Sequence, residues 1–90
     1  MKGVDIMIKA IEYMKTELNL KLVEDNYFIS IFKNEKLRVR IIYRERSFFS
    51  KGIIEVYVND YVFYLHSWNE LYNLVDKIKV NYYKNKKINL

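Results

Sequence analysis

The sequence has no cysteine and no proline among its 90 residues, and it contains only two glycines and one histidine. The lack of cysteine excludes a disulfide framework and a thiolate zinc site, and one histidine is too few for a structural transition-metal site. Gly3 and Gly52 are far apart in the chain, so a glycine-rich loop that cradles phosphates cannot be built. We therefore expect no metal and no cofactor, and the glycine content argues against nucleotide hydrolysis.

A long apolar run is also missing. No segment approaches the roughly 20 apolar residues that span a bilayer. The amino-terminal segment is interrupted by Asp5, Lys9 and Glu12, so it does not have the apolar centre of a signal peptide. We expect a protein of the cytoplasm that is neither exported nor embedded in a membrane.

The charge is unbalanced, because 16 lysines and arginines face 11 aspartates and glutamates and give a net charge of +5. Such a charge permits nucleic acid or an acidic protein as partner. The sequence is rich in residues with AT-rich codons, so the lysines reflect codon bias and the arginines are the better signal. All the arginines fall between residues 38 and 46: Arg38, Arg40, Arg44 and Arg46.

The periodicity of apolar residues predicts helices at both ends of the chain. Apolar residues recur every three or four positions over residues 4–18, including Ile8, Met14 and Leu18. Ser67 and Glu70 have the spacing of a capping box, in which each side chain bonds to the backbone amide of the other. A second amphipathic helix is expected from there, and we expect the basic tail from about residue 85 to be frayed.

Four strands are expected between the helices, over residues 27–33, 37–45, 53–58 and 61–66. Residues 21–25 are interpreted as a polar connection. Hairpins without a helical crossover favour an antiparallel sheet. The expected fold is one α+β domain, residues 1–90, in which a four-stranded antiparallel sheet carries both helices on one face.

Turn length sets which residues share a sheet face. A two-residue turn at Asn59 and Asp60 places Val56 opposite Phe63. A three-residue turn in the first hairpin places Ile31 opposite Val39, with Phe32 beside the arginines. A two-residue turn there would reverse the faces of the first strand.

The expected binding residues share the sheet face that the helices leave bare. They are four arginines and four aromatic residues: Arg38, Arg40, Arg44, Arg46, Phe28, Phe32, Tyr57 and Tyr64. Bases of a single-stranded nucleic acid stack on such rings while arginines neutralise phosphates. The same residue types also anchor protein interfaces, including those between two copies of one chain. Phe48 and Phe49 are a possible contact in the loop, or they fold back over the core edge.

Catalysis is not expected, because no pair of carboxylates and no nucleophile with its base is placed by the sequence. The alternative is a metal-independent nuclease in which His66 acts as general base and Tyr64 or an arginine stabilises the phosphorane. His66 has no partner acid or base in the pattern. We expect it to have no chemical role.

The function we expect is therefore binding to a protein partner. Short proteins of this composition without catalytic motifs are frequent among phage genes that inhibit host defence, including anti-CRISPR proteins, and this analogy suggests an inhibitor of a larger nucleic-acid-handling machine. A basic chain is a poor mimic of DNA, so such an inhibitor would engage an acidic protein surface or a nucleic acid. The alternatives are a module that binds single-stranded nucleic acid directly and a homodimeric interaction module.

Overall fold

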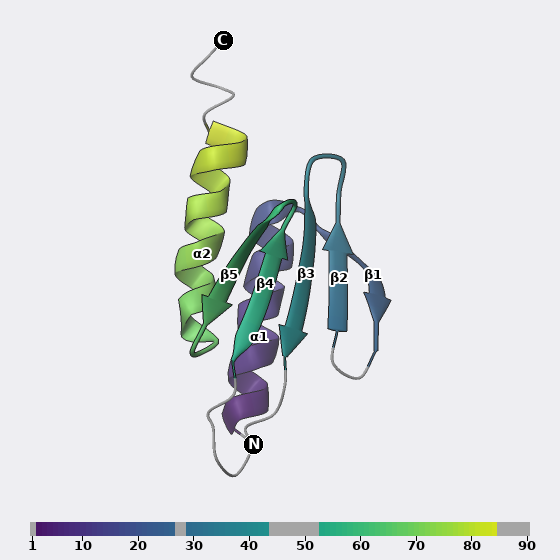
Figure 1. Cartoon of the computed structure of the whole chain (residues 1–90). Helices are drawn as coiled ribbons and strands as arrows, with labels where there is room; N and C mark the ends of the chain where they lie inside the picture. Colours follow the sequence, from purple (N-terminus) through teal and green to yellow (C-terminus); the bar gives the residue numbers. More distant parts are fainter. Residues whose placement is uncertain (1, 27–28, 44–52, 85–90) are drawn as a thin grey trace.

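The computed structural model describes residues 2–26, 29–43 and 53–84, which form a sheet flanked by an amino-terminal and a carboxyl-terminal helix (Figure 1). The elements have these bounds in chain order: α1 Lys2–Leu18, β1 Lys21–Asp25, β2 Ile29–Lys33, β3 Arg38–Tyr43, β4 Ile54–Val58, β5 Tyr61–Leu65, α2 Asn69–Lys79 and the π-helical segment η1 Val80–Lys84. The α+β class with an antiparallel sheet agrees with the prediction. None of the described helices is long and apolar enough to cross a membrane.

Some of the predictions fall on positions outside the described residues. These are Phe28, Arg44, Arg46, Phe48, Phe49 and the tail from residue 85.

The sheet is a meander of five strands within the described residues, in the order β1-β2-β3-β4-β5 with every neighbouring pair antiparallel. The prediction of four strands is wrong, because residues 21–25 pair with β2 as the edge strand β1. All five β1 residues are exposed, so this strand lacks the buried alternation by which a sequence pattern identifies a strand. Its register with β2 shifts between Leu22 and Glu24.

The first hairpin has a two-residue turn at residues 35–36, so the register based on three residues is wrong. Phe32 lies opposite Val39 and Ile31 lies opposite Arg40. Because side chains alternate along a strand, a shift of one residue exchanges its two faces. Phe32 therefore joins the core, where it is 2% exposed, and does not lie beside the arginines.

The second hairpin has the predicted register, with Val56 opposite Phe63. Asn59 adopts a φ of 53°, in the left-handed region that asparagine tolerates better than most residues. Its Oδ1 accepts a hydrogen bond from the Arg38 N–H at 2.9 Å, so this turn is tied to β3 as well as to its own strands.

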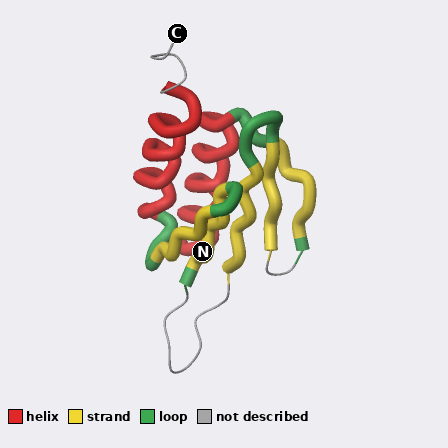
Figure 2. Tube along the Cα trace, turned by 45° about the horizontal axis from the view of Figure 1, so that its top comes forward, coloured by secondary structure: helices red, strands yellow, loops and turns green. Residues whose placement is uncertain are grey.

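Both helices lie on the same side of the sheet (Figure 2). The core cluster joins buried residues of the helices to buried residues of the facing strand surface. Its strand members are Phe32, Val39, Ile41, Ile54, Val56, Val58 and Leu65, and its helix members are Ala10, Met14, Leu18, Leu71, Leu74, Val75 and Ile78. The opposite surface carries no helix, and we call it the outer face.

The buried stripe of α1 differs in part from the predicted one. Ala10, Met14 and Leu18 follow each other at intervals of four residues and are at most 1% exposed. Ile8, which the prediction placed on the apolar face, is 50% exposed. The small Ala10 side chain takes part in the core although it gives little hydrophobic signal in the sequence.

The second helix begins where the sequence predicted, but without the predicted capping box. No side chain caps α2, and Trp68 is its N-cap residue. The Glu70 carboxylate accepts a hydrogen bond from the His66 N–H at 3.3 Å instead of from Ser67. Trp68 is 9% exposed and belongs to the core, so its burial fixes the start of the helix.

Two polar contacts connect α1 to α2. The Tyr13 hydroxyl donates to Asp76 Oδ1 at 3.0 Å, and Lys79 Nζ donates to Glu17 Oε1. The rings of Tyr13 and Tyr72 lie 4.9 Å apart between their centroids. The helical layer is therefore joined by polar and aromatic contacts as well as by its buried stripe.

Candidate binding surface on the outer sheet face

The outer face consists of rows of side chains that run across the strands, because residues directly opposite each other in a sheet point to the same face. The basic row is Lys21, Lys33 and Arg38. The central row is Glu24, Ile31, Arg40, Tyr57 and Val62. The third row is Ile29, Ile42, Glu55 and Tyr64. The face is therefore basic at one end and largely apolar towards the other.

Arg40 and Tyr57 form the centre of this face. They are direct partners across β3 and β4, and the Arg40 guanidinium carbon lies 4.4 Å from the centroid of the Tyr57 ring. This is the geometry of a cation–π contact. Ile31, the partner of Arg40 on the other side, is only 7% exposed although it lies outside the helix-facing core. The centre of the outer face is therefore packed as well as charged.

The Tyr57 hydroxyl is also fixed, since it donates to Glu55 Oε1 at 3.0 Å. This hydrogen bond raises the pKa of Tyr57 above its ordinary value of 10.0, with a smaller contribution from burial and an opposing one from Arg40. Tyr57 is therefore held between a carboxylate at its hydroxyl and a guanidinium over its ring.

Arg40 has no carboxylate partner among the described residues, where the ion pairs join Lys15 to Glu12 and Lys79 to Glu17. Its Nε is buried and makes no hydrogen bond in the described structure. A buried donor without an acceptor costs free energy, so such an atom calls for a structural or functional reason.

The structure places two of the four predicted aromatic residues on the outer face. Tyr64 is 59% exposed, while Tyr57 is half-buried beneath Arg40. Phe32 lies in the core, and Phe28 is outside the described residues. Among the described residues, Tyr64 is therefore the one predicted ring whose face is open enough for a base to stack on it.

Of the predicted arginines, Arg38 and Arg40 lie on the outer face as expected. Sequence reasoning missed its aliphatic residues Ile29, Ile31 and Ile42. It also attributed the lysines to codon bias, and therefore did not include Lys33 of the basic row among the binding residues. The signal that could have found them is the two-residue turn, because it places residue 33 opposite residue 38.

His66 lies at the exposed junction of β5 and α2, and its backbone N–H donates to Glu70. None of the described residues forms a hydrogen bond with its imidazole ring. Within the described part of the chain, no three histidine, aspartate or glutamate side chains are grouped so that they could hold a metal ion. The described residues therefore place no acid or base in hydrogen-bonding contact with the His66 imidazole that would support the nuclease alternative.

Comparison of the chain with protein-family models, with curated proteins and with solved structures finds no match.

Proposed function

We propose that the protein is a small binding protein without catalytic activity that docks on a larger protein through its outer face. Arg40 stacked on Tyr57 at the centre of the helix-free outer face is the observation that carries this proposal. Arginine and tyrosine are enriched among the residues that dominate protein interfaces, and they act near the centre of the buried patch.

The stacked arrangement favours binding because it exists before the partner arrives. A free arginine loses side-chain entropy when it is immobilised at an interface. In this protein the Tyr57 ring already restricts the guanidinium of Arg40. Val62, the partner of Tyr57 on β5, is apolar and 40% exposed, so a partner that covers the centre also removes apolar surface from water.

A protein partner fits the face better than a single-stranded nucleic acid does. Binding of single strands requires several open rings, each worth about 1–3 kcal/mol, beside cations that meet the phosphates. Tyr64 lies in the third row, two rows away from the basic row. The open ring of Tyr64 is therefore separated from the basic row, and the Tyr57 ring is already covered by Arg40.

Inhibition of a larger machine is the role that we propose for this binding. An inhibitor needs no catalytic group, and a short chain with one packed centre on an exposed sheet face is sufficient to block a surface. The cytoplasm is the compartment that we expect for such a complex, since the chain carries no cysteine.

The test is affinity capture with the whole chain and with variants at the centre. Arg40→Ala should weaken the captured complex by about 30-fold, which corresponds to roughly 2 kcal/mol at a central interface residue. The affinity of Arg40→Lys should lie between those of Arg40→Ala and the original chain, because lysine keeps the charge and the aliphatic stem but lacks the planar guanidinium. Lys9→Ala, on the exposed side of α1, is the matched control and should bind as the original chain does.

Circular dichroism and urea unfolding must show that the Arg40 variants are folded. Equal capture by the original chain and by both Arg40 variants would contradict the proposal. Binding of an oligonucleotide that weakens steeply between about 50 and 200 mM salt and is lost in Arg40→Ala would instead establish the nucleic-acid module.

A further inference from the structure

The basic row places like charges directly opposite each other on two successive strand pairs. Lys33 is the partner of Lys21 on β1 and of Arg38 on β3. Neighbouring strands are about 4.8 Å apart, and like charges at directly opposed positions destabilise a sheet. No described carboxylate forms an ion pair with any of the three. The fold therefore keeps an arrangement of charges that costs it stability.

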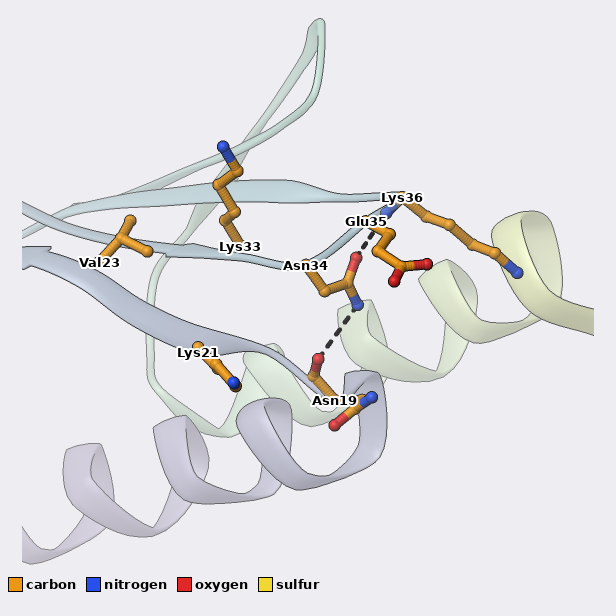
Figure 3. A pocket seen from close by; sticks show the side chains of 7 residues that line it. All are labelled: Asn19, Lys21, Val23, Lys33, Asn34, Glu35 and Lys36. Atoms are coloured by element: carbon orange, nitrogen blue, oxygen red, sulfur yellow. Dashed lines mark hydrogen bonds between the residues drawn. The ribbon is translucent and has the colours of Figure 1, made fainter.

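A shallow pocket of about 730 Å³ opens beside this row, at the end of the sheet where α1 leads into β1 (Figure 3). Its lining is mainly basic and polar: Asn19, Lys21, Val23, Lys33, Asn34, Glu35 and Lys36. The lysine side chains point in different directions in Figure 3. They do not converge on one point, so the pocket is unsuited to gripping a single small anion and suits charges distributed along a chain.

Asn34 forms the fixed part of this pocket. Its Nδ2 donates to the carbonyl oxygens of Leu18 and Asn19 at 2.8 and 3.2 Å. Its Oδ1 accepts from the N–H groups of Lys36 and Leu37 at 2.7 and 2.8 Å. Asn34 thus ties the end of α1 to the β2–β3 turn and holds the two sides of the pocket together.

We propose that the basic row and its pocket bind an acidic, extended segment of the protein partner. This proposal rests on the proposed docking of a protein on the outer face. Carboxylates on alternate residues of an extended segment lie about 6.5 to 7 Å apart, a spacing that flexible lysine stems over neighbouring strands can meet. The exposed aliphatic side chain of Val23 borders the row in the pocket, and the next row holds Glu24, the buried Ile31 and Arg40. Carboxylates therefore match the three cations and an aliphatic group matches Val23, whereas the described residues of the row and the pocket include no aromatic ring on which a base could stack.

The binding test is a titration of the isotope-labelled protein with a synthetic peptide of about eight alternating glutamate and leucine residues. Binding is measured from the changes in the amide chemical shifts of the protein. The peptide should shift the amide signals of Lys21, Lys33 and Arg38. Lys33→Glu should weaken the affinity for the peptide by about tenfold or more. Lys9→Glu makes the same charge change on α1 and should alter the affinity by less than about twofold. An oligothymidylate with the same number of negative charges is the competing probe.

A peptide that binds Lys33→Glu as tightly as the original chain, or that shifts amides elsewhere, would overturn the proposal. Tighter binding of oligothymidylate than of the peptide at the basic row would also overturn it, in favour of a nucleic acid at this site.

A second measurement tests the charge arrangement without any ligand. Glutamate at position 33 replaces two like-charge pairs by two opposite-charge pairs, so the urea midpoint of Lys33→Glu should rise, with Lys33→Gln between it and the original chain. A midpoint that falls in both variants would remove the physical basis of the proposal.

The two proposals fail in different ways. If Arg40→Ala no longer captures the protein partner while Lys33→Glu still does, the outer face binds a protein but the basic row does not bind an acidic segment. If Lys33→Glu alone affects binding, the acidic segment is bound but the centre of the face is not the interface.

Discussion

Phe32 is the aromatic side chain that joins β2 to the helical layer. It is 2% exposed in the core cluster, whereas Tyr64 is 59% exposed on the outer face. Removing a buried phenylalanine side chain costs its transfer free energy and leaves a cavity. Phe32→Ala should therefore lower the free energy of unfolding by about 3–5 kcal/mol, measured by urea denaturation.

Tyr64→Ala is the matched control, and it should change the free energy of unfolding by no more than about 0.5 kcal/mol. If Phe32→Ala does not fold, Phe32→Leu gives the same ranking at a smaller cost because it keeps most of the apolar volume. Equal effects at positions 32 and 64 would mean that the two-residue turn of the first hairpin is not the native one.

The contact between α1 and α2 should depend on pH. The hydrogen bond from Tyr13 to Asp76 raises the pKa of Tyr13 above 10.0. The hydrogen bond to Glu17 likewise raises the pKa of Lys79 above 10.5. The folded protein thus holds both protons more tightly than the unfolded chain does, so their contribution is fully present below pH 10 and is lost as the pH rises through the raised values.

The measurement is the free energy of unfolding in urea between about pH 8 and pH 11.5, the range that spans these pKa values. Stability should fall above pH 10, and it should fall less steeply in Tyr13→Phe, which cannot ionise. Tyr61→Phe, an exposed residue of β5 without a hydrogen bond to any described residue, should keep the original slope. An unchanged slope in Tyr13→Phe would contradict the role given to this helix contact.

The two edges of the sheet differ in how they are protected against association. β1 carries Lys21, Glu24 and Asp25 and has a register shift, which are features that discourage edge-to-edge pairing. β5 carries no charged residue, and four of its five residues are exposed. Of the two described edge strands, β5 is therefore the less protected against pairing with a further strand.

We expect the protein to associate through β5 when it is concentrated in high salt, which screens the net charge of +5. Val62→Lys should reduce this association, because a charge on an edge strand opposes pairing with another strand. Light scattering after size-exclusion chromatography measures it, with Val23→Lys on β1 as the control. A protein that stays monomeric throughout would refute this prediction and the homodimer alternative together.

The sequence determined those features that a repeating pattern encodes locally. The amphipathic helix after Ser67, the strand that carries Arg38 and Arg40 on the helix-free face and the register of the β4–β5 hairpin were all predicted, because burial on one side of an element imposes its period on the residues. The pairing of Val56 with Phe63 follows from a short turn that the sequence marks with Asn59.

Tertiary structure alone decided the features that lack such a period. β1 is exposed throughout, so its pairing with β2 leaves no hydrophobic pattern. Ile31 and Phe32 are both apolar, so composition could not say which faces the helices, and the length of one turn decided it. The basic row exists because the pairing of β1, β2 and β3 places Lys21, Lys33 and Arg38 side by side. The pairing of Lys33 with Arg38 depends on the turn between β2 and β3, and the pairing with Lys21 depends on an exposed strand that leaves no periodic pattern in the sequence.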